Sequence, residues 1–483
     1  MTATPGAHRY EVAAPDGGWG WAVVFASFLA TSLCGGSIYS FGVLYVAYLD
    51  EFERSKAATA WIGSIFTCTF TFAMSASLGL SHKIGHRATV MLAGLVSSIG
   101  LALTSFASNI YSVYITHGLI TGFGFGMGYM PGIDIISVYF KKRLSLALGL
   151  GMAGTGAGHF VLSISGQALF DIYGLHGTLM ILSASVLNLC VAGALLRPLG
   201  EHHTAVVDVP VRCDDNEGHE IDDTNSQAVS DKASVNESID DAKTSLEEIQ
   251  DIQSKSTVAR SRKKLTCKSV VHSCISFMYD IQLMTEPVFL AMVFIAMLQT
   301  FGQYAGAAHM VMRVRDYGIS DSKSAVIPAV MGLAQMIGRP LYGFIGNCFS
   351  IRPTLIYSVG MSLCAITTAV SVLVKSFTVQ LIYVIVFGMS LGGYKVYIPI
   401  VVSHFFGPKK LGYGTTFLSQ VHGVLGLLVS PLIGWMRDVS GGYDGAFWVI
   451  SAAYLLGALV SLLLPLVDKL VKRRRSSMQT DDS

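Results

Sequence analysis

Charged side chains are scarce in this sequence. Asp, Glu, Lys and Arg make up 13% of its 483 residues, against roughly 25% in an average soluble domain. Most of these charges fall in one central stretch and two tails, so the remainder is almost uncharged and apolar. This distribution excludes an ordinary soluble domain. The net charge of +2 argues neither for nor against a nucleic-acid partner, and we expect none.

Patterns typical of enzymes and metal sites are also lacking. The eight cysteines are scattered mostly through apolar segments, and Cys267 and Cys274 have no second pair nearby, so no metal site is predicted. The sequence has no Walker A loop, nucleophile elbow or His-Glu-x-x-His pattern, so we expect neither an enzyme nor a cofactor. The first 18 residues lack the apolar core of a secretory signal, and the first hydrophobic segment is expected to remain as a membrane anchor.

Long apolar runs dominate the rest of the chain. A helix that crosses a bilayer needs about 20 mostly apolar residues. We predict twelve such spans, at 19–48, 58–80, 88–107, 110–138, 144–170, 175–196, 286–312, 323–347, 353–373, 378–403, 411–436 and 443–467. They form two sets of six, 19–196 and 286–467, with tails at 1–18 and 468–483.

The polar stretch between the two sets, 197–285, is rich in Asp, Glu, Ser, Lys and Asn. Such a composition cannot bury enough apolar surface to offset chain entropy, so we predict a disordered loop. Its last part, 263–284, is expected to form an amphipathic helix at the membrane surface.

Lys and Arg in the short loops predict the orientation. Basic residues follow the second, fourth, tenth and last spans, and the alternate loops are poorer in them. The exceptions are Arg54, Lys56, Arg313 and Arg315. Because cytoplasmic loops carry the excess of positive charge, we predict that both termini and the central loop face the cytoplasm.

An internal repeat relates the two sets of spans. The segment from Gly124 to Pro131 in the fourth span is similar to 392–399 in the tenth, and a pair of lysines follows each span. Six plus six spans with this echo are typical of two parallel halves. We therefore predict an all-α integral membrane protein with the major facilitator fold, twelve transmembrane helices in two six-helix halves and a substrate cavity between them.

Two segments go beyond the fold class. The first comprises Asp16, Gly17, Gly18, Trp19, Gly20 and Trp21. The second comprises Tyr139, Phe140, Lys141, Lys142 and Arg143, and continues through Gly149 to the run that starts at Ala153 and Gly154. At this spacing the pair resembles the two signature motifs of the monocarboxylate transporter family. Weaker similarity covers the chain outside the central loop and tails.

The residues of both motifs also have physical roles that do not involve substrate. Trp19 and Trp21 suit the interface of the lipid bilayer. The carboxylate of Asp16 can cap free N–H groups at a helix start. Glycines such as Gly154 let helices approach closely. We therefore expect both motifs to be structural.

Charged or titratable side chains inside the spans are candidate site residues, because burying them in a membrane is costly. Arg339 aligns with the arginine that family members use to hold the substrate carboxylate, which its planar guanidinium matches; the alternative is a structural pair. Lys395 is expected either to add to this anion site or to pair with Asp134, which could instead cap or gate near the cytoplasmic end. His159 and His422 are candidates for proton handling, with hydrogen-bonded packing as the alternative.

Two positions depart from the family pattern. Proton-coupled members carry a Lys in the first span and an Asp four residues before the Arg of the eighth. Tyr39 and Gln335 stand at these positions. We expect both near the substrate, but neither can replace the charge. The standard proton mechanism is therefore not expected, and His159 or His422 would have to restore coupling.

The resemblance implies a secondary transporter that moves a monocarboxylate or related small organic anion across the plasma membrane by alternating access. An uncoupled facilitator of a zwitterionic or amino-acid-like solute is the first alternative, and a non-transporting membrane sensor or scaffold is the second. A candidate partner implied by the resemblance is the single-span immunoglobulin-type ancillary protein that some family members need.

Overall fold

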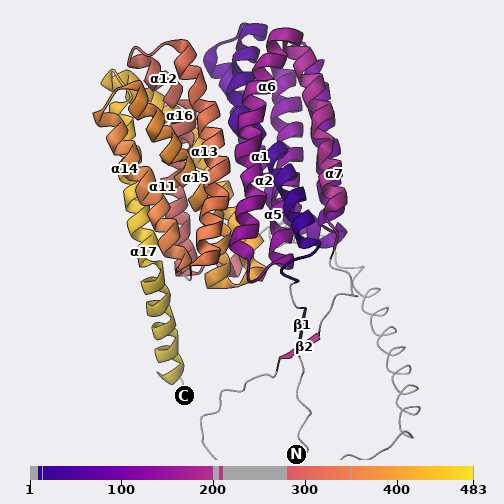
Figure 1. Ribbon diagram of the computed structural model, residues 1–483, viewed down its shortest axis with the longest axis vertical. Coiled ribbons are helices and arrows are strands. Elements are labelled where there is room, and N and C mark those ends of the chain that lie inside the picture. The colour runs from indigo at the N-terminus through magenta and orange to yellow at the C-terminus, as the bar shows by residue number, and fades with distance from the viewer. Residues whose placement is uncertain (1–8, 13–14, 199–205, 210–279, 350, 482–483) are drawn as a thin grey trace, which may run out of the picture. The chain divides into compact units, whose positions relative to one another are not determined.

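A computed structural model of the chain describes residues 9–12, 15–198, 206–209, 280–349 and 351–481. These residues divide into a helical unit, within Ala14–Thr204 and Ser276–Ser483, and a small second unit, within Met1–Ala13 and Ala205–Ile275. Figure 1 shows the helical unit as two groups of helices, one from each half of the sequence.

The N-terminal half of the helical unit is built from eight helical segments. They are α1 (Gly20–Phe52), α2 (Lys56–Ile84), α3 (His86–Ser105), α4 (Ile110–Val113), the π-helix η1 (Tyr114–Thr121), α5 (Gly122–Tyr139), α6 (Leu144–Val186) and α7 (Asn188–Leu195). The described C-terminal half comprises α10 (Ile281–Met284), α11 (Pro287–Ala308), α12 (Met310–Asp316), α13 (Asp321–Cys348), α14 (Pro353–Leu373), α15 (Phe377–Phe406), the short 3₁₀ helix η4 (Pro408–Lys410), α16 (Leu411–Ser440) and α17 (Asp444–Asp481).

Gly174 divides α6 into two limbs that run in opposite directions. Its φ of +65° is favourable only for glycine. Just after it, His176 contacts Ser105 at the end of α3, whereas a Cβ on Gly193 would lie 2.7 Å from Met91 near the start of α3. The second limb and α7 therefore run antiparallel to α3. This reversal separates the fifth and sixth predicted spans.

The helices agree with the predicted spans. Nine stretches of the described residues are long and apolar enough to cross a membrane, and one of them, Leu144–Leu195, contains the reversal at Gly174. Together with α11 and α13, they are consistent with twelve crossings. Large apolar side chains such as Phe25, Leu455 and Leu459 lie exposed on the outside of the bundle, as expected for surfaces that contact lipid.

Two helix ends differ from the bounds of the predicted spans. The seventh span was predicted at 286–312, whereas α11 ends at Ala308 and a separate helix, α12, follows. The last span was predicted at 443–467, and the helix that contains it, α17, continues to Asp481. In both cases the additional helical residues are polar, and a prediction from hydropathy alone does not include polar helical residues.

The second unit contains strands β1 (Arg9–Val12) and β2 (Val206–Val209), which pair antiparallel with Arg9 opposite Val209. Within the stretch 197–285, which was predicted to be a disordered loop, the structure describes Val206–Val209 as a strand. Of the helix predicted at 263–284, the described part holds only α10 (Ile281–Met284). The rest lies outside the described residues.

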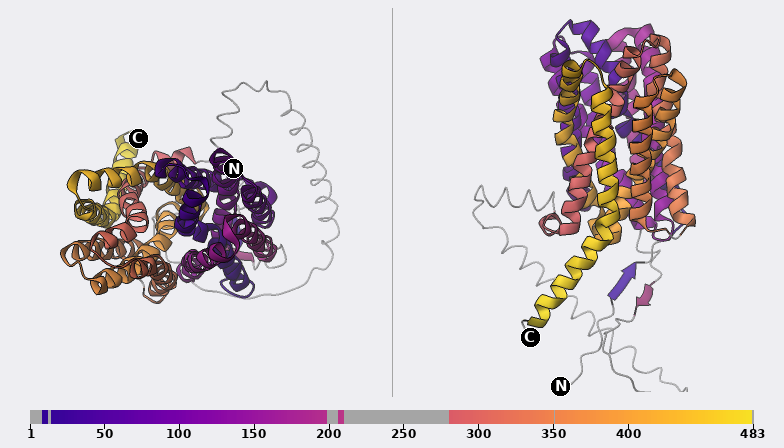
Figure 2. Two further views of the ribbon diagram at one scale, coloured as in Figure 1. Left: turned by 90° about the horizontal axis from the view of Figure 1, so that it is seen from above. Right: turned by 90° about the vertical axis from the view of Figure 1, so that its left-hand side faces the viewer.

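The two ends of the helical unit need names. We call the end with the start of α1 and the end of α5 the tail side (lower end in Figure 1), and the end with Phe52 and Ser105 the far side. The side view in Figure 2 shows α17 running from the far side to the tail side. At the tail side, α1 begins against Phe140, which lies 2.9 Å from where a Cβ on Gly20 would stand.

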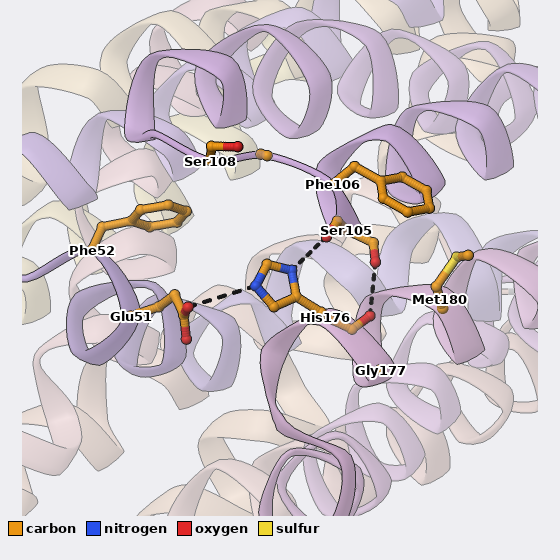
Figure 3. Close-up of a pocket in the computed structure, with 9 residues that line it drawn as sticks. Glu51, Phe52, Ser105, Phe106, Ser108, His176, Gly177 and Met180 are labelled. Atoms are coloured by element: carbon orange, nitrogen blue, oxygen red, sulfur yellow. Dashed lines mark hydrogen bonds and ion pairs between the residues drawn. The ribbon is translucent and has the colours of Figure 1, made fainter.

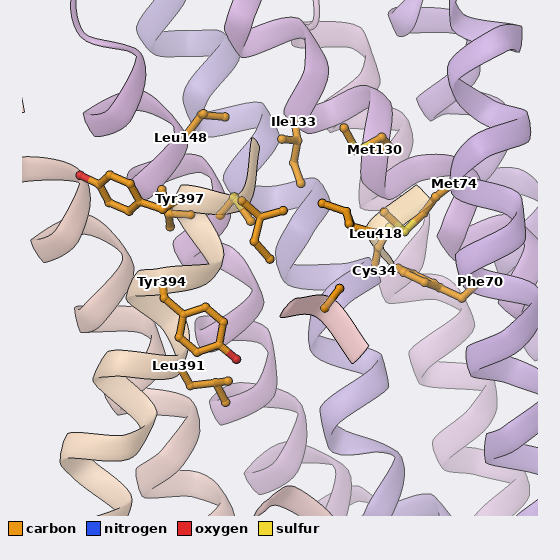
Figure 4. Packing of buried hydrophobic residues seen from close by; sticks show 14 of the residues in the cluster. Cys34, Phe70, Met74, Met130, Ile133, Leu148, Leu391, Tyr394, Tyr397 and Leu418 are labelled. Atoms are coloured by element: carbon orange, nitrogen blue, oxygen red, sulfur yellow. The ribbon is translucent and has the colours of Figure 1, made fainter. Parts of the chain in front are cut away.

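The two halves pack closely through small residues. A Cβ on Gly149 of α6 would lie 2.7 Å from the Arg339 carbonyl oxygen of α13, and one on Gly343 would lie 2.5 Å from that of Ser145. The second pair of crossing helices is α2 and α16, where Gln420 Nε2 donates to Ser75 Oγ at 2.8 Å. One cluster of buried apolar residues includes both halves, as Figure 4 shows with Cys34, Phe70, Met74, Met130, Ile133 and Leu148 beside Leu391, Tyr394, Tyr397 and Leu418.

Candidate functional site

The two motif segments meet at the tail side. Asp16 Oδ1 accepts hydrogen bonds from the backbone N–H groups of Lys141, Lys142 and Arg143, at 2.9, 2.9 and 3.3 Å. These groups lie in the turn immediately before α6, which begins at Leu144. The Asp16 N–H in turn donates to the Tyr139 carbonyl oxygen at 3.0 Å. The first motif therefore fixes the turn through which the second motif enters α6.

The aromatic residues of the motifs extend this junction. The rings of Trp21 and Phe140 pack with their centroids 5.1 Å apart. Trp19 Nε1 donates to the Leu195 carbonyl oxygen at 3.2 Å, and Arg197 lies over its ring. Tyr139 Oη donates to the Arg197 carbonyl oxygen at 2.8 Å. These contacts join α1, α5 and the end of α7, and they place the first motif and the start of the second, Tyr139–Arg143, in a structural joint. The later part of the second motif reaches the cavity described next, which Thr155 lines.

A cavity of about 100 Å³ lies between the two halves. It is lined by α1, α2, α5 and α6 from one half and by α11, α13, α15 and α16 from the other. Its polar lining comprises Thr67, Thr71, Tyr129, Thr155, Gln303, Arg339, Lys395, Thr415, Ser419 and His422. Two of these side chains are cationic, and none of the described lining residues is an aspartate or a glutamate.

Arg339 spans the boundary between the halves. It lies on α13, and only 1% of its surface is exposed. One guanidinium nitrogen donates to the Met152 carbonyl oxygen of α6, and another donates to Gln335 Oε1 at 3.3 Å. Gln335 is fully buried and orients Arg339, but it is not among the residues that line the cavity. The guanidinium therefore lies where a solute between the halves would meet it.

Lys395 of α15 reaches the same cavity. Its Nζ donates to Gln303 Oε1 of α11 at 2.5 Å. It lies close enough to Arg339 and His422 for their charges to interact. Sequence reasoning did not select Gln303, although an amide within an apolar span was a usable signal.

The alternative pairing of Lys395 with Asp134 does not occur. Asp134 contacts His86 Nε2 at 3.1 Å instead, near the tail side. A Cβ on Gly412, in the first turn of α16, would lie 2.9 Å from Asp134 Oδ1. Asp134 thus lies at the start of a helix from the opposite half, where the helix dipole favours a carboxylate. This position suits the gating alternative.

The two candidate histidines have different surroundings. His422 is 6% exposed, and its Nδ1 lies 2.7 Å from the Leu418 carbonyl oxygen. Because a carbonyl only accepts, Nδ1 carries the hydrogen, and in the neutral ring Nε2 is an acceptor. That Nε2 is buried without a hydrogen-bond partner among the described residues. His159 instead packs against Gly332 at the α6–α13 boundary and is not among the residues that line the cavity. Tyr39 lies on α1, but its side chain is outside those that the structure describes.

A second and larger cavity, about 590 Å³, lies within the N-terminal half at the far side. Figure 3 shows His176 between two acceptors, Glu51 Oε1 at 3.6 Å from its Nε2 and the Ser105 carbonyl oxygen beside its Nδ1. Ser105 Oγ also donates to the His176 carbonyl oxygen at 2.9 Å. These contacts tie the ends of α1 and α3 to the second limb of α6, all within one half.

Arg313 is one of the loop cations that did not fit the charge pattern, and the structure explains its place at the far side. The residue is 1% exposed, and its guanidinium donates to Ser371 Oγ, the Ser371 carbonyl oxygen and Tyr317 Oη, at 3.0, 2.8 and 2.7 Å. Tyr317 Oη donates in turn to Asp444 at 2.6 Å. Burial and this hydrogen bond raise the pKa of the Tyr317 hydroxyl, so that it remains a donor. Arg313 therefore fastens α12 to α14 and α17.

Comparisons with known proteins agree with this arrangement. The family model described as Major Facilitator Superfamily matches residues 27–248 and 288–480. Monocarboxylate transporter 12-B of Danio rerio is 26% identical over 450 residues, which cover 92% of this chain and 87% of that protein. Human monocarboxylate transporters 14 and 12 are 27% and 28% identical, each over 96% of this chain and over 94% and 83% of their own lengths.

Solved structures show the same fold at low sequence identity. The E. coli fucose:proton symporter has a TM-score of 0.59 and 13% identity, with 92% of this chain and 99% of that chain covered. A proton:xylose symporter also has a TM-score of 0.59 and 13% identity, with 93% and 96% covered. The relatives are transporters and not enzymes. With a family model that covers most of its length, the chain belongs to the Major Facilitator Superfamily and is a membrane transporter.

Proposed function

We propose that this transporter moves a monocarboxylate or a related small organic anion across the plasma membrane by alternating access. The observation that carries the proposal is the cavity between the halves, which Arg339 and Lys395 line and to which the described residues bring no carboxylate. An anion satisfies both cations there, and a guanidinium matches a carboxylate with two parallel N–H groups. The names of the curated relatives support the same class of solute.

The electrostatics of the cavity oppose the two alternatives. A zwitterionic solute would bring its ammonium group close to the two cations and find only neutral acceptors, such as His422 Nε2 and hydroxyl groups. A scaffold has no use for cations held at the boundary of its two halves, where burying each one costs free energy. An anion carrier explains both cations.

Contacts on the tail side of the cavity support alternating access. Gly149 and Gly343 bring α6 and α13 together there, and Asp134 and His82 reach the start of α16 from the other half, His82 by stacking on Tyr413 with a centroid separation of 6.1 Å. In this conformation the tail side is closed. Transport requires these contacts to separate while the halves close on the far side.

A panel of solutes tests the proposal. Cells or liposomes with the full chain are expected to take up at least one of radiolabelled lactate, pyruvate or 3-hydroxybutyrate, at a rate that saturates. They are not expected to take up leucine or betaine, which are zwitterions, at a comparable rate. Uptake of the zwitterions alone would favour the first alternative, and uptake of no solute in the panel would contradict the proposal.

We also predict that the tail side faces the cytoplasm, with both termini and the segment 197–285. An epitope inserted near residue 230 should be inaccessible to antibody outside intact cells and should become accessible after permeabilisation. The matched control is the same epitope after Arg54, in the exposed turn between α1 and α2 at the far side, which should be labelled in intact cells. External labelling near residue 230 would reverse the orientation.

A further inference from the structure

The cavity contains an imbalance of charge that the proposed function leaves unexplained. Two cations, Arg339 and Lys395, face one small space, whereas a monocarboxylate brings one negative charge. We propose that Lys395 is the residue on which a proton and the substrate anion bind cooperatively, so that it couples anion transport to the proton gradient. This inference rests on the proposed function and assigns a coupling residue on α15 to a chain that has Tyr39 and Gln335 at the charged positions of the family.

Of the two cations in the cavity, Arg339 and Lys395, Lys395 is the one whose charge can change. An arginine side chain keeps its proton in proteins, whereas a lysine can release one when it is buried. The other charged or titratable groups that line the cavity are Arg339 from α13, His422 from α16 and Tyr129 from α5, and the neutral amide of Gln303 from α11 bonds Lys395 directly. The described lining residues of α1, α2 and α6 are neutral. No described carboxylate therefore offsets the charge of Lys395.

Gln303 allows Lys395 to hold its position in both protonation states. The Gln303 Oε1 atom accepts a hydrogen bond from Nζ at 2.5 Å, and either an ammonium or an amine group can donate it. The change is a simple protonation, in which the amine takes a proton from water to give an ammonium and releases the same proton on the other side. No co-reactant is required.

The two binding events favour each other. An anion beside Arg339 and Lys395 offsets the repulsion between the two cations, so a bound anion favours the protonated form of Lys395. By linkage, the proton favours the anion to the same degree. Anion and proton therefore enter and leave together.

The formal charge of the cavity, together with linkage, explains why two states would account for most crossings. With anion and proton bound, two cations and one anion give +1, and with neither bound, Arg339 alone gives +1. A bound proton without the anion gives +2, and a bound anion without the proton gives zero. Because a buried charge is costly, the state of +2 is the least able to close the cavity and reorient. The state of zero charge is sparsely populated, because by linkage the anion binds weakly when Lys395 lacks its proton. Most reorientation is then by the fully loaded and the empty carrier.

Lys395→Arg tests this mechanism, because it fixes the positive charge. The full chain in liposomes, with the membrane potential clamped, is given an inward proton gradient and the best transported of radiolabelled lactate, pyruvate and 3-hydroxybutyrate. The wild-type chain should accumulate the anion above its external concentration, and a protonophore should abolish the accumulation. Lys395→Arg should lose about tenfold or more of the accumulation but retain exchange of internal for external anion, since exchange never requires the empty carrier to return.

Two further variants identify the responsible residue. Lys410→Arg makes the same chemical change outside the cavity, where Lys410 pairs with Asp280 at 3.2 Å, and should behave as wild type. His422→Gln alters the wall of the cavity and with it the rate of uptake, but the ratio of internal to external anion at steady state should still rise with the imposed proton gradient. Accumulation by Lys395→Arg at the wild-type level, or its loss in His422→Gln alone, would overturn the inference.

A measurement on the wild-type chain needs no variant. Adding the transported anion to purified protein in weakly buffered solution should cause uptake of protons, reported by a pH indicator. An absence of proton uptake, or wild-type transport without accumulation, overturns the inference and leaves the proposed function intact. If the wild-type chain transports none of the three anions, the proposed function itself is contradicted.

Discussion

Replacing Arg339 with alanine is expected to abolish transport while the chain still reaches the membrane. The guanidinium is 1% exposed and lies on the wall of the cavity. Removing one partner of a buried, hydrogen-bonded charge pair costs about 2–5 kcal/mol, and roughly 1.4 kcal/mol corresponds to tenfold in affinity. We therefore expect solute uptake, normalised to the amount of chain at the surface, to fall by a factor of about 30 or more.

Arg339→Lys separates charge from shape. A lysine keeps the positive charge but cannot present two parallel N–H groups to a carboxylate. Its single ammonium group also cannot replace the two nitrogens with which Arg339 bonds Met152 and Gln335. Its uptake should be clearly impaired, although less than that of the alanine variant. The control is Arg352→Ala, an exposed arginine before α14. Full uptake by a well-inserted Arg339→Ala chain would show that Arg339 serves packing and not the solute.

Local composition predicts most of this fold, because each membrane span must bury its own backbone in a helix and expose apolar side chains to lipid. The positions of α2, α3 and α14 follow directly from their apolar runs. Composition predicts the helix ends less well where the last turns of a helix are polar. Hydropathy does not predict α12 as a helix separate from α11, and it does not predict that α17 continues beyond Lys469. Both α12 and the end of α17 are helical without being apolar.

Partners across the structure are harder to predict than the residues themselves. The sequence identified Asp134 and Lys395 as buried charges, but it could not show that His86 and Gln303 satisfy them from other helices. The same holds for Asp16. A capping role was expected from its place before a helix, yet the N–H groups that it accepts from begin at Lys141, 125 residues later in the chain, in the turn before α6. Spacing along one helix carries no information on which faces of two helices meet.

Arg313 shows how a loop charge can mislead. Counted as a cation in a short loop, it opposed the predicted orientation. In the structure it is buried among Ser371, Tyr317 and Phe447, with its guanidinium 4.0 Å from the centre of the Phe447 ring. A buried and paired arginine serves packing, and it differs in this respect from the exposed lysines at the tail side.

The second large effect is expected from Gly154→Ala. Gly154 lies in the second motif, where α6 crosses α1. An added Cβ would overlap the Phe28 carbonyl oxygen and lie 2.5 Å from Thr31 Oγ1, which itself donates to the Gly151 carbonyl oxygen at 2.7 Å. The obstacle is helix backbone, which cannot move aside as a flexible side chain can, so α1 and α6 must separate.

Overpacking of this kind costs typically about 1–3 kcal/mol, and more where backbone is displaced. We expect much less folded chain in the membrane and a lower melting temperature in detergent, measured by size-exclusion chromatography after heating. Gly434→Ala is the matched control, because Gly434 lies within α16 and its added Cβ would meet nothing within 4 Å. Both substitutions gain the roughly 1 kcal/mol by which alanine exceeds glycine in a helix, so the difference between the two variants isolates the α1–α6 contact. Equal stability of the two variants would mean that the glycines of the motif are not required for close packing.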